Sequence, residues 1–141
     1  MKEVLFRGKT VDTNEWIQGS LVRALGYLDE DEKFFIIPED ALYYNHGEFD
    51  FVKEVRLETV GQYTGLYDKF NRRIFENDIV RVCEDDGNEF CKGFVYFDKK
   101  KGTTYVKSQR GYRTYVAMLT SITKVISNIH DNPNLLDEVK E

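Results

Sequence analysis

The chain has 141 residues, the size of one domain or of two closely joined subdomains. Hydrophobic residues make up 41% of it and aromatic residues 14%, a content too high for an intrinsically disordered chain. The net charge of −5 is unevenly distributed, because the segment from Lys92 to Tyr115 carries +6 and the remainder −11. This asymmetry indicates an acidic or nucleic-acid partner, or self-association between complementary surfaces.

The ends and the cysteine content of the chain indicate where it resides. No apolar run of signal-peptide length follows the start at Met1–Arg7, and no segment approaches the roughly 20 apolar residues of a membrane helix. Only two cysteines occur, which fits a reducing compartment. We therefore expect a cytoplasmic protein with no membrane partner.

The first half of the chain is predicted to contain short strands, because β-branched and aromatic residues cluster there between turn residues. Gly19 indicates a bulge or a close backbone approach. Val55, Leu57 and Thr59 alternate as in a strand with one buried face. The acidic run Asp29–Glu32 lacks the ligand spacing of a calcium loop, so we expect a solvated loop and no metal. The expected strands cover Val4–Arg7, Trp16–Val22, Phe34–Ile37 and Phe51–Leu57.

The second half is predicted to contain a hairpin of Ile79–Cys83 and Phe90–Phe97, closed by a two-residue turn at Asp86-Gly87. This register places the cysteines on opposite faces of the hairpin, whereas one more turn residue would bring them together. The predicted pairs are Val80 with Gly93, Val82 with Cys91 and Cys83 with Phe90.

Further strands are expected at Thr103–Lys107, Tyr112–Leu119 and Ile122–Ile129. Asn132 has the character of an N-cap and Pro133 that of a first helical residue, so a short helix is predicted over residues 133–140. The sequence therefore predicts an all-β, mainly β chain with one short C-terminal helix.

Three stretches of the chain have a distinctive sequence: Phe6-Arg7-Gly8-Lys9 with Trp16–Leu21, Thr59–Lys69 with Ile74–Val80, and Val125–Ile129 with Asn132–Leu136. Together they resemble the YopX-like family of phage proteins. Asn77 and Ser127 stand where that family usually has glycine, and asparagine tolerates the left-handed backbone that such a turn requires.

The resemblance implies a phage or prophage origin and homo-oligomerisation. It also implies an irregular N-terminal β subdomain, residues 1–60, and an SH3-like barrel with a helical tail, residues 61–141. It carries over no activity and no catalytic or ligand residue.

The residues themselves offer no pattern of a catalytic or metal site. His46 and His130 lie in different halves of the chain, and neither belongs to a nucleophile motif. Zinc-ligand spacing and a phosphate-binding glycine-rich loop are both missing from the sequence. We therefore expect a protein that is not an enzyme and that uses no cofactor and no metal.

Two groups of residues are candidates for binding. Gln62, Tyr63 and Asp78 belong to the family-like segments and are predicted either to shape turns or to contact a ligand. The second group is a basic, aromatic stretch within residues 99–115, of the kind that stacks bases and neutralises phosphates: Tyr105, Lys107, Arg110, Tyr112 and Arg113.

The expected function is that of a binding or homo-oligomeric assembly module. Its expected partner is a second copy of the chain, with a phage or host protein as a further partner, because charge-segregated subunits can pair opposite surfaces. The alternative function is nucleic-acid binding through the basic, aromatic stretch.

Overall fold

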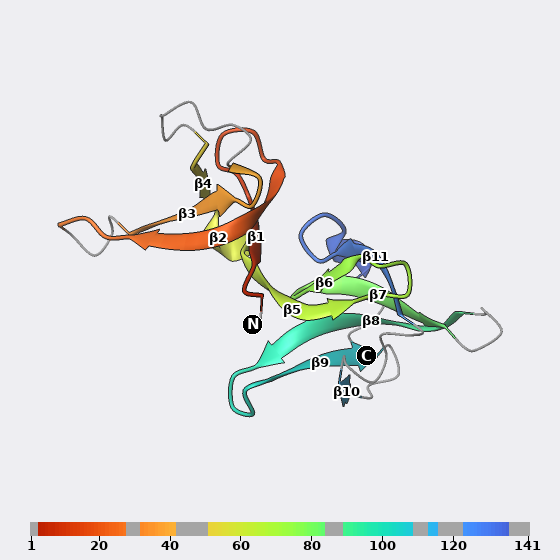
Figure 1. The fold of residues 1–141 in the computed structure, drawn as a ribbon. Helices are drawn as coiled ribbons and strands as arrows, with labels where there is room; N and C mark the ends of the chain where they lie inside the picture. The colour runs from red at the N-terminus through yellow and green to blue at the C-terminus, as the bar shows by residue number, and fades with distance from the viewer. Residues whose placement is uncertain are drawn as a thin grey trace. The chain divides into compact units, whose positions relative to one another are not determined.

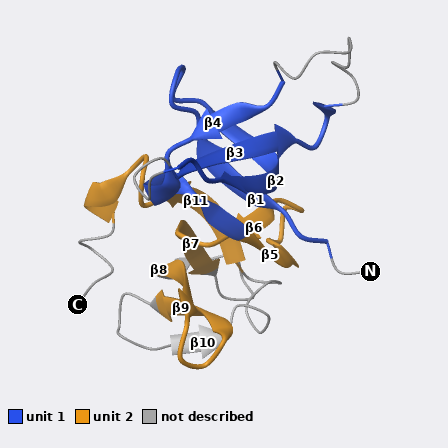
Figure 2. Ribbon diagram, turned by 90° about the vertical axis from the view of Figure 1, so that its left-hand side faces the viewer, with its two compact units in different colours: residues 1–62 blue, residues 63–141 orange. Residues whose placement is uncertain are grey.

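A computed structural model of the chain describes residues 3–27, 32–41, 51–83, 89–108, 113–115 and 123–135 (Figure 1). Its strands pair antiparallel throughout, and a 3₁₀ turn, Leu57–Thr59, lies between two of them. The predicted all-β fold is confirmed. Residues 133–135 are helical, and the rest of the predicted helix lies outside the described residues. The chain divides into two compact units, residues 1–62 and 63–141 (Figure 2).

Unit 1 is a small sheet that closes on itself. The strand β1 (Phe6–Lys9) pairs with β2 (Trp16–Ala24), β2 with β3 (Lys33–Pro38), and β3 with β4 (Lys53–Val55). The free edge of β4 then meets the chain just after β1. Thr10 bridges Val55, the Val11 amide donates to Glu54 O at 2.9 Å, and the Arg56 amide donates to Lys9 O at 3.0 Å.

The 3₁₀ turn explains why one predicted strand is shorter than expected. Val55 and Thr59 are buried as the alternation predicts, but Leu57 is 54% exposed, because the chain leaves β4 at Arg56. The Thr59 hydroxyl accepts a hydrogen bond from the Lys9 amide at 2.9 Å and donates one to Arg56 O at 2.6 Å. A buried threonine therefore fixes this turn against β1.

Gly19 and Trp16 of β2 serve packing of two kinds. A Cβ on Gly19 would lie 1.9 Å from Ile37 O of β3, so the predicted close backbone approach is confirmed. Trp16 is only half-buried, and the guanidinium of Arg7 and the ammonium of Lys9 lie 4.9 and 5.3 Å from its ring centroid. Trp16 is therefore held by cation–π contacts at the surface of β1 and β2.

Unit 2 contains a five-stranded sheet and a hairpin. The hairpin is formed by β5 (Gly61–Tyr67) and β6 (Arg73–Phe75), which pair through Tyr63 with Phe75 and Tyr67 with Arg73. The first two residues of β5 belong to unit 1, where they pair with β1. The sheet has the order β10 (Arg113–Tyr115), β9 (Thr103–Ser108), β8 (Glu89–Asp98), β7 (Asp78–Cys83) and β11 (Thr123–Asn128).

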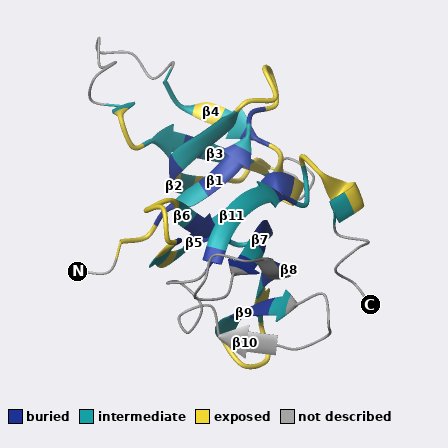
Figure 3. Cartoon of the chain, turned by 90° about the vertical axis from the view of Figure 1, so that its right-hand side faces the viewer, coloured by how far each residue is buried: buried dark blue, intermediate teal, exposed yellow. Residues whose placement is uncertain are grey.

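The core of unit 2 lies between this hairpin and one face of the five-stranded sheet. Its fully buried side chains come from alternate positions of the sheet strands and from β6, and buried segments are dark blue in Figure 3. The core members are Ile74, Val80, Val95 and Val106, with Leu66 and Val125 packed against them. The SH3-like assignment of this unit stays a prediction.

The predicted hairpin of β7 and β8 has the predicted register except at one end. Val80 pairs with Gly93 and Val82 with Cys91, but Cys83 pairs with Glu89 instead of Phe90, because a bulge shifts the register after Val82. The turn at residues 84–88 lies outside the described residues, and so does most of the predicted strand over residues 112–119. Asn77 has φ = 71°, so it occupies the left-handed turn position expected for it.

Replacing Gly19 by alanine should destabilise unit 1 by about 3 kcal/mol, because the new methyl group meets backbone atoms that cannot rotate away. Trp16 is the only tryptophan and belongs to unit 1, so its fluorescence during urea unfolding reports this unit. Gly65→Ala is the control, because Gly65 belongs to unit 2 and nothing lies within 4 Å of its Cβ position, so the Trp16 midpoint should not change. Equal midpoints for Gly19→Ala and the wild type would contradict the close approach.

Candidate binding surfaces

The turn between β5 and β6 is organised by one buried carboxylate, that of Asp68, whose side chain is 0% exposed. Its Oδ1 accepts hydrogen bonds from the amides of Phe70 at 2.8 Å and Arg72 at 2.9 Å. Its Oδ2 accepts from Arg72 Nε at 3.2 Å and from the Val125 amide at 3.0 Å. The Lys69 amide donates to Thr123 O at 2.9 Å. The turn is therefore fastened to the start of β11.

These contacts determine the protonation of Asp68. Burial alone would raise the pKa of its carboxyl, but the backbone amides of Val125, Arg72 and Phe70, together with the charge of Arg72, outweigh burial and hold the pKa below its ordinary value of 3.8. The ionised carboxylate is consequently the form that stabilises the folded unit.

The same turn presents an aromatic ring surrounded by cations. Phe70 is 56% exposed. The ammonium of Lys69 lies 5.1 Å from its ring centroid, the guanidinium of Arg72 5.5 Å and the ammonium of Lys124 5.6 Å. Since Lys124 belongs to β11, this cluster depends on the attachment of the turn to that strand.

The cluster continues across the sheet. Lys124 of β11 pairs directly with Arg81 of β7, and Arg81 pairs directly with Lys92 of β8. Directly opposite residues of antiparallel strands share a face, so these three cations form a row on the face of the sheet that lies away from the buried valines. We call the combined set the Phe70 surface: Lys69, Phe70, Arg72, Lys124, Arg81 and Lys92.

Three predicted site residues occupy structural positions. Tyr63 is 4% exposed, and its ring lies 5.6 Å from that of Phe75. Asp78 is 1% exposed, and its Oδ2 accepts a hydrogen bond from the Phe75 amide at 2.7 Å. Gln62 is half-buried and pairs with Phe6 in unit 1. Tyr63 and Asp78 therefore both contact Phe75, which fits their turn-shaping interpretation.

The predicted basic, aromatic stretch is only partly described. Tyr105 is 7% exposed and its ring stacks on that of Tyr96 at 5.9 Å, so it has little surface on which a base could stack. Lys107 is half-buried and pairs with Phe94 on one side and with Arg113 on the other. Arg110 and Tyr112 lie outside the described residues, and only the backbone of Arg113 is described.

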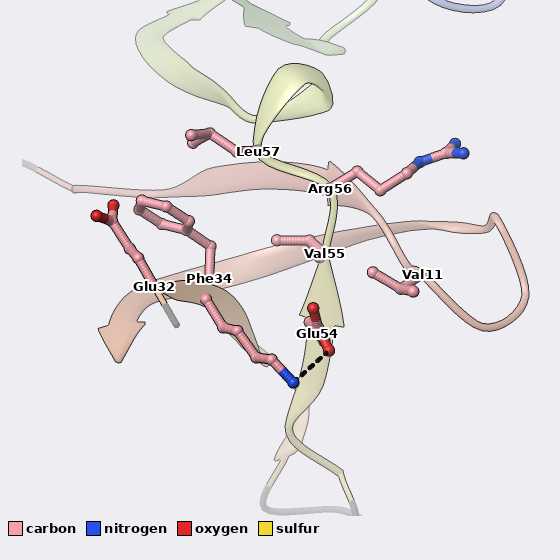
Figure 4. Close-up of a pocket in the computed structure, with 8 residues that line it drawn as sticks. Val11, Glu32, Phe34, Glu54, Val55, Arg56 and Leu57 are labelled. Atoms are coloured by element: carbon pink, nitrogen blue, oxygen red, sulfur yellow. Dashed lines mark ion pairs between the residues drawn. The ribbon is translucent and has the colours of Figure 1, made fainter. Parts of the chain in front are cut away.

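Unit 1 carries a separate open groove of about 420 Å³ beside β4 (Figure 4). Exposed Val11 and Leu57 flank buried Val55, and an ion pair joins Lys33 Nζ to Glu54 Oε1 at 4.0 Å. The remaining lining residues are Glu32, Phe34 and Arg56. Serine, cysteine and histidine are missing from this described lining, so the groove has the composition of a contact surface.

The described residues contain neither a metal cluster nor a membrane-spanning helix. Within the described ranges, no group of three or more His, Cys, Asp or Glu side chains is arranged to hold a metal ion. In the same part of the chain, no helix has the length and apolar character needed to cross a membrane.

The Phe70 surface was missed from the sequence. A phenylalanine between Lys69 and Arg72 in a polar turn is a local signal that could have suggested it. The contribution of Lys124 could not be read locally, because it depends on a hydrogen bond between Asp68 and Val125, which are 57 positions apart.

Comparison with known proteins identifies the family. The YopX protein family matches residues 5–137. The chain belongs to this family. The crystal structure of protein EF1440 from Enterococcus faecalis has a similar fold, with a TM-score of 0.55 and 19% sequence identity over 96% of this chain and 99% of that chain. No curated protein matches the chain. At this identity the structural likeness concerns the fold alone.

Replacing Asp68 by asparagine should destabilise unit 2 by about 3 kcal/mol at neutral pH, because an amide supplies neither the charge nor two acceptor oxygens for the four donors. Circular dichroism during urea unfolding measures the loss. The matched control is Asp98→Asn, whose Oδ1 accepts from the Lys100 and Lys101 amides in an exposed turn. Its cost should stay below about 1 kcal/mol.

The contribution of Asp68 should also depend on pH. Its pKa is lower in the folded state than in the unfolded one, so the stabilisation is complete above 3.8 and is lost as pH falls through the lowered folded-state pKa. The difference in unfolding free energy between wild type and Asp68→Asn should therefore shrink on acidification below pH 3.8. A difference that stayed constant to the acid end of the titration would contradict this assignment.

Proposed function

We propose that this protein is a non-enzymatic accessory protein of a phage or prophage, acting in the bacterial cytoplasm as a self-assembling binding module. The observation that carries the proposal is the apolar end of the β2–β3 hairpin. Val22, Leu25 and Tyr27 at this end are 40%, 67% and 105% exposed. Adjacent exposed apolar side chains are typical of protein–protein contacts.

The backbone at this end supports the same proposal. β1 pairs with β2 only through Trp16–Gly19, whereas β3 pairs with it as far as Ala24. Within the described residues, the other edge of Ser20–Ala24 thus has no strand beside it. In Figure 1 this part of the hairpin extends away from the remaining strands of unit 1. An open edge flanked by apolar side chains favours pairing with the same strand of a second copy.

The distribution of charge supports a homo-oligomer as well. Residues 1–62 contain seven Lys and Arg against thirteen Asp and Glu, whereas residues 63–141 contain thirteen Lys and Arg against twelve Asp and Glu. Two of those twelve, Asp68 and Asp78, are buried. Complementary surfaces of this kind guide the association of copies and make it sensitive to salt.

We propose no reaction for this protein because of the residues that form its two described candidate surfaces. The groove of unit 1 presents apolar side chains, Glu32, Arg56 and the ion pair of Lys33 with Glu54, and the Phe70 surface presents cations and a ring. Neither set includes a nucleophile beside a general base, the arrangement that covalent catalysis requires. Both sets suit the binding of a partner.

Sedimentation or light scattering tests the assembly. The wild type should be larger than the 16.6 kDa of one chain, and Leu25→Ser combined with Tyr27→Ser should weaken the assembly at least tenfold. Phe97→Ser is the matched control, because Phe97 is also an exposed aromatic residue, at 45%, but lies on β8. A wild-type monomer at low and physiological salt would refute the proposal.

A further inference from the structure

We infer that the Phe70 surface binds single-stranded nucleic acid, with the Phe70 ring stacking on a base and the surrounding cations contacting phosphates. The surface comprises Lys69, Phe70, Arg72, Lys124, Arg81 and Lys92. This inference goes beyond self-assembly, because it assigns a ligand class to a different part of the molecule.

The first step of the argument is the exposure of Phe70. A side chain that is 56% exposed at the end of a turn contributes little to the core, whose members come from other positions of unit 2. Yet the turn itself is rigidly defined, since the Asp68 carboxylate and the Lys69 amide fasten it to β11. An exposed ring on a turn whose backbone is fixed is a suitable stacking platform, because the backbone loses little freedom when a base covers the ring.

The second step is the position of the cations. Three lie over the ring within 5.6 Å of its centroid, so a base that takes their place on the ring would leave them beside its flanking phosphates. Of these three cations, Arg72 forms an ion pair with the buried Asp68, and among the residues that the structure describes no carboxylate pairs with the other two. The charges of Lys69 and Lys124 are therefore not neutralised by an ion pair with Asp68.

The third step is the row that leads away from the ring. Lys124, Arg81 and Lys92 are half-buried residues at directly paired positions of neighbouring strands, which are about 4.8 Å apart, so they form a line across one face of the sheet. A nucleic-acid strand also carries regularly repeated charges, one per about 3.4 Å when stacked and more widely spaced when extended. The row therefore has the spacing needed to follow a phosphate backbone that begins at the ring.

The combination of ring and row selects the class of partner. In a duplex the bases are stacked inside and cannot reach Phe70, whereas every unpaired base offers a flat surface to it. An acidic peptide would satisfy the cations but offers no ring at each repeat. The geometry consequently favours a single strand of DNA or RNA.

The affinity of the full-length protein for a fluorescent oligothymidylate of about 15 nucleotides tests the inference. With about four phosphates neutralised, log K should fall with log salt at a slope of about −3. Phe70→Ala should weaken binding about tenfold without changing that slope, whereas Phe70→Tyr should bind as tightly as the wild type. Lys124→Gln should reduce the slope by about 0.7.

Matched variants separate this surface from a general charge effect. Lys99→Gln removes an exposed lysine of the β8–β9 turn, and Phe97→Ala removes an exposed ring of β8. Both should leave affinity and slope unchanged. The inference would be overturned if the wild type did not bind, or if it bound duplex or polyglutamate as tightly as the single strand. It would also be overturned if Phe97→Ala lost as much affinity as Phe70→Ala.

The outcome is independent of the proposed assembly. Phe70 and Lys124 belong to unit 2, whereas Leu25 and Tyr27 belong to unit 1, so sedimentation of the Phe70 and Lys124 variants should match the wild type. An oligomer without oligothymidylate binding overturns this inference alone. A monomer that binds the single strand with the predicted slope overturns the proposed assembly alone.

Discussion

The candidate binding surface depends on one buried carboxylate. Asp68 accepts four hydrogen bonds, and one of the donors, the Val125 amide, belongs to a strand far away in the sequence. A buried charge without such partners would be costly, so the turn and β11 must remain together for the carboxylate to stay ionised. The position of the Phe70 ring beside Lys124 is a consequence of this requirement.

Buried polar residues serve a similar purpose in unit 1. Thr59 joins the 3₁₀ turn to β1 through the Lys9 amide, and Thr10 accepts at its hydroxyl from the Glu15 amide at 3.2 Å. These contacts hold the points where the sheet closes on itself. The described part of each unit has few fully buried apolar side chains, so fixed hydrogen bonds at turns make a larger relative contribution to its shape.

Much of the fold could be predicted from the sequence because it follows from local patterns. Alternation of apolar residues and turn chemistry located β7 and β8 and gave their register at Val80 and Val82. Gly19 marked a close backbone approach because a side chain there would meet Ile37 O. The prediction was wrong at Leu57 and at Cys83, where a 3₁₀ turn and a bulge changed the direction of side chains. Period-two alternation cannot reveal such interruptions.

The binding surface was harder to predict, since its residues come together only through long-range pairing. The sequence drew attention to the basic stretch around Tyr105, but that ring is buried against Tyr96. An exposed ring lies instead at Phe70, and all three cations of its row, Lys124, Arg81 and Lys92, lie outside that stretch. The charge density along the sequence therefore indicated which sheet is basic, but it did not identify the residues of the Phe70 surface.

A module that assembles through unit 1 and binds a strand through unit 2 would present several copies of the Phe70 surface to one nucleic acid. Such multivalency raises the overall affinity without requiring new contacts. The central claim is that the Phe70 ring is where a base stacks. Photo-crosslinking of a 5-iodouracil oligonucleotide, followed by mass spectrometry of the modified peptide, measures this directly. The account predicts a crosslink at Phe70, and a crosslink confined to the stretch from Tyr105 to Tyr115 would contradict it.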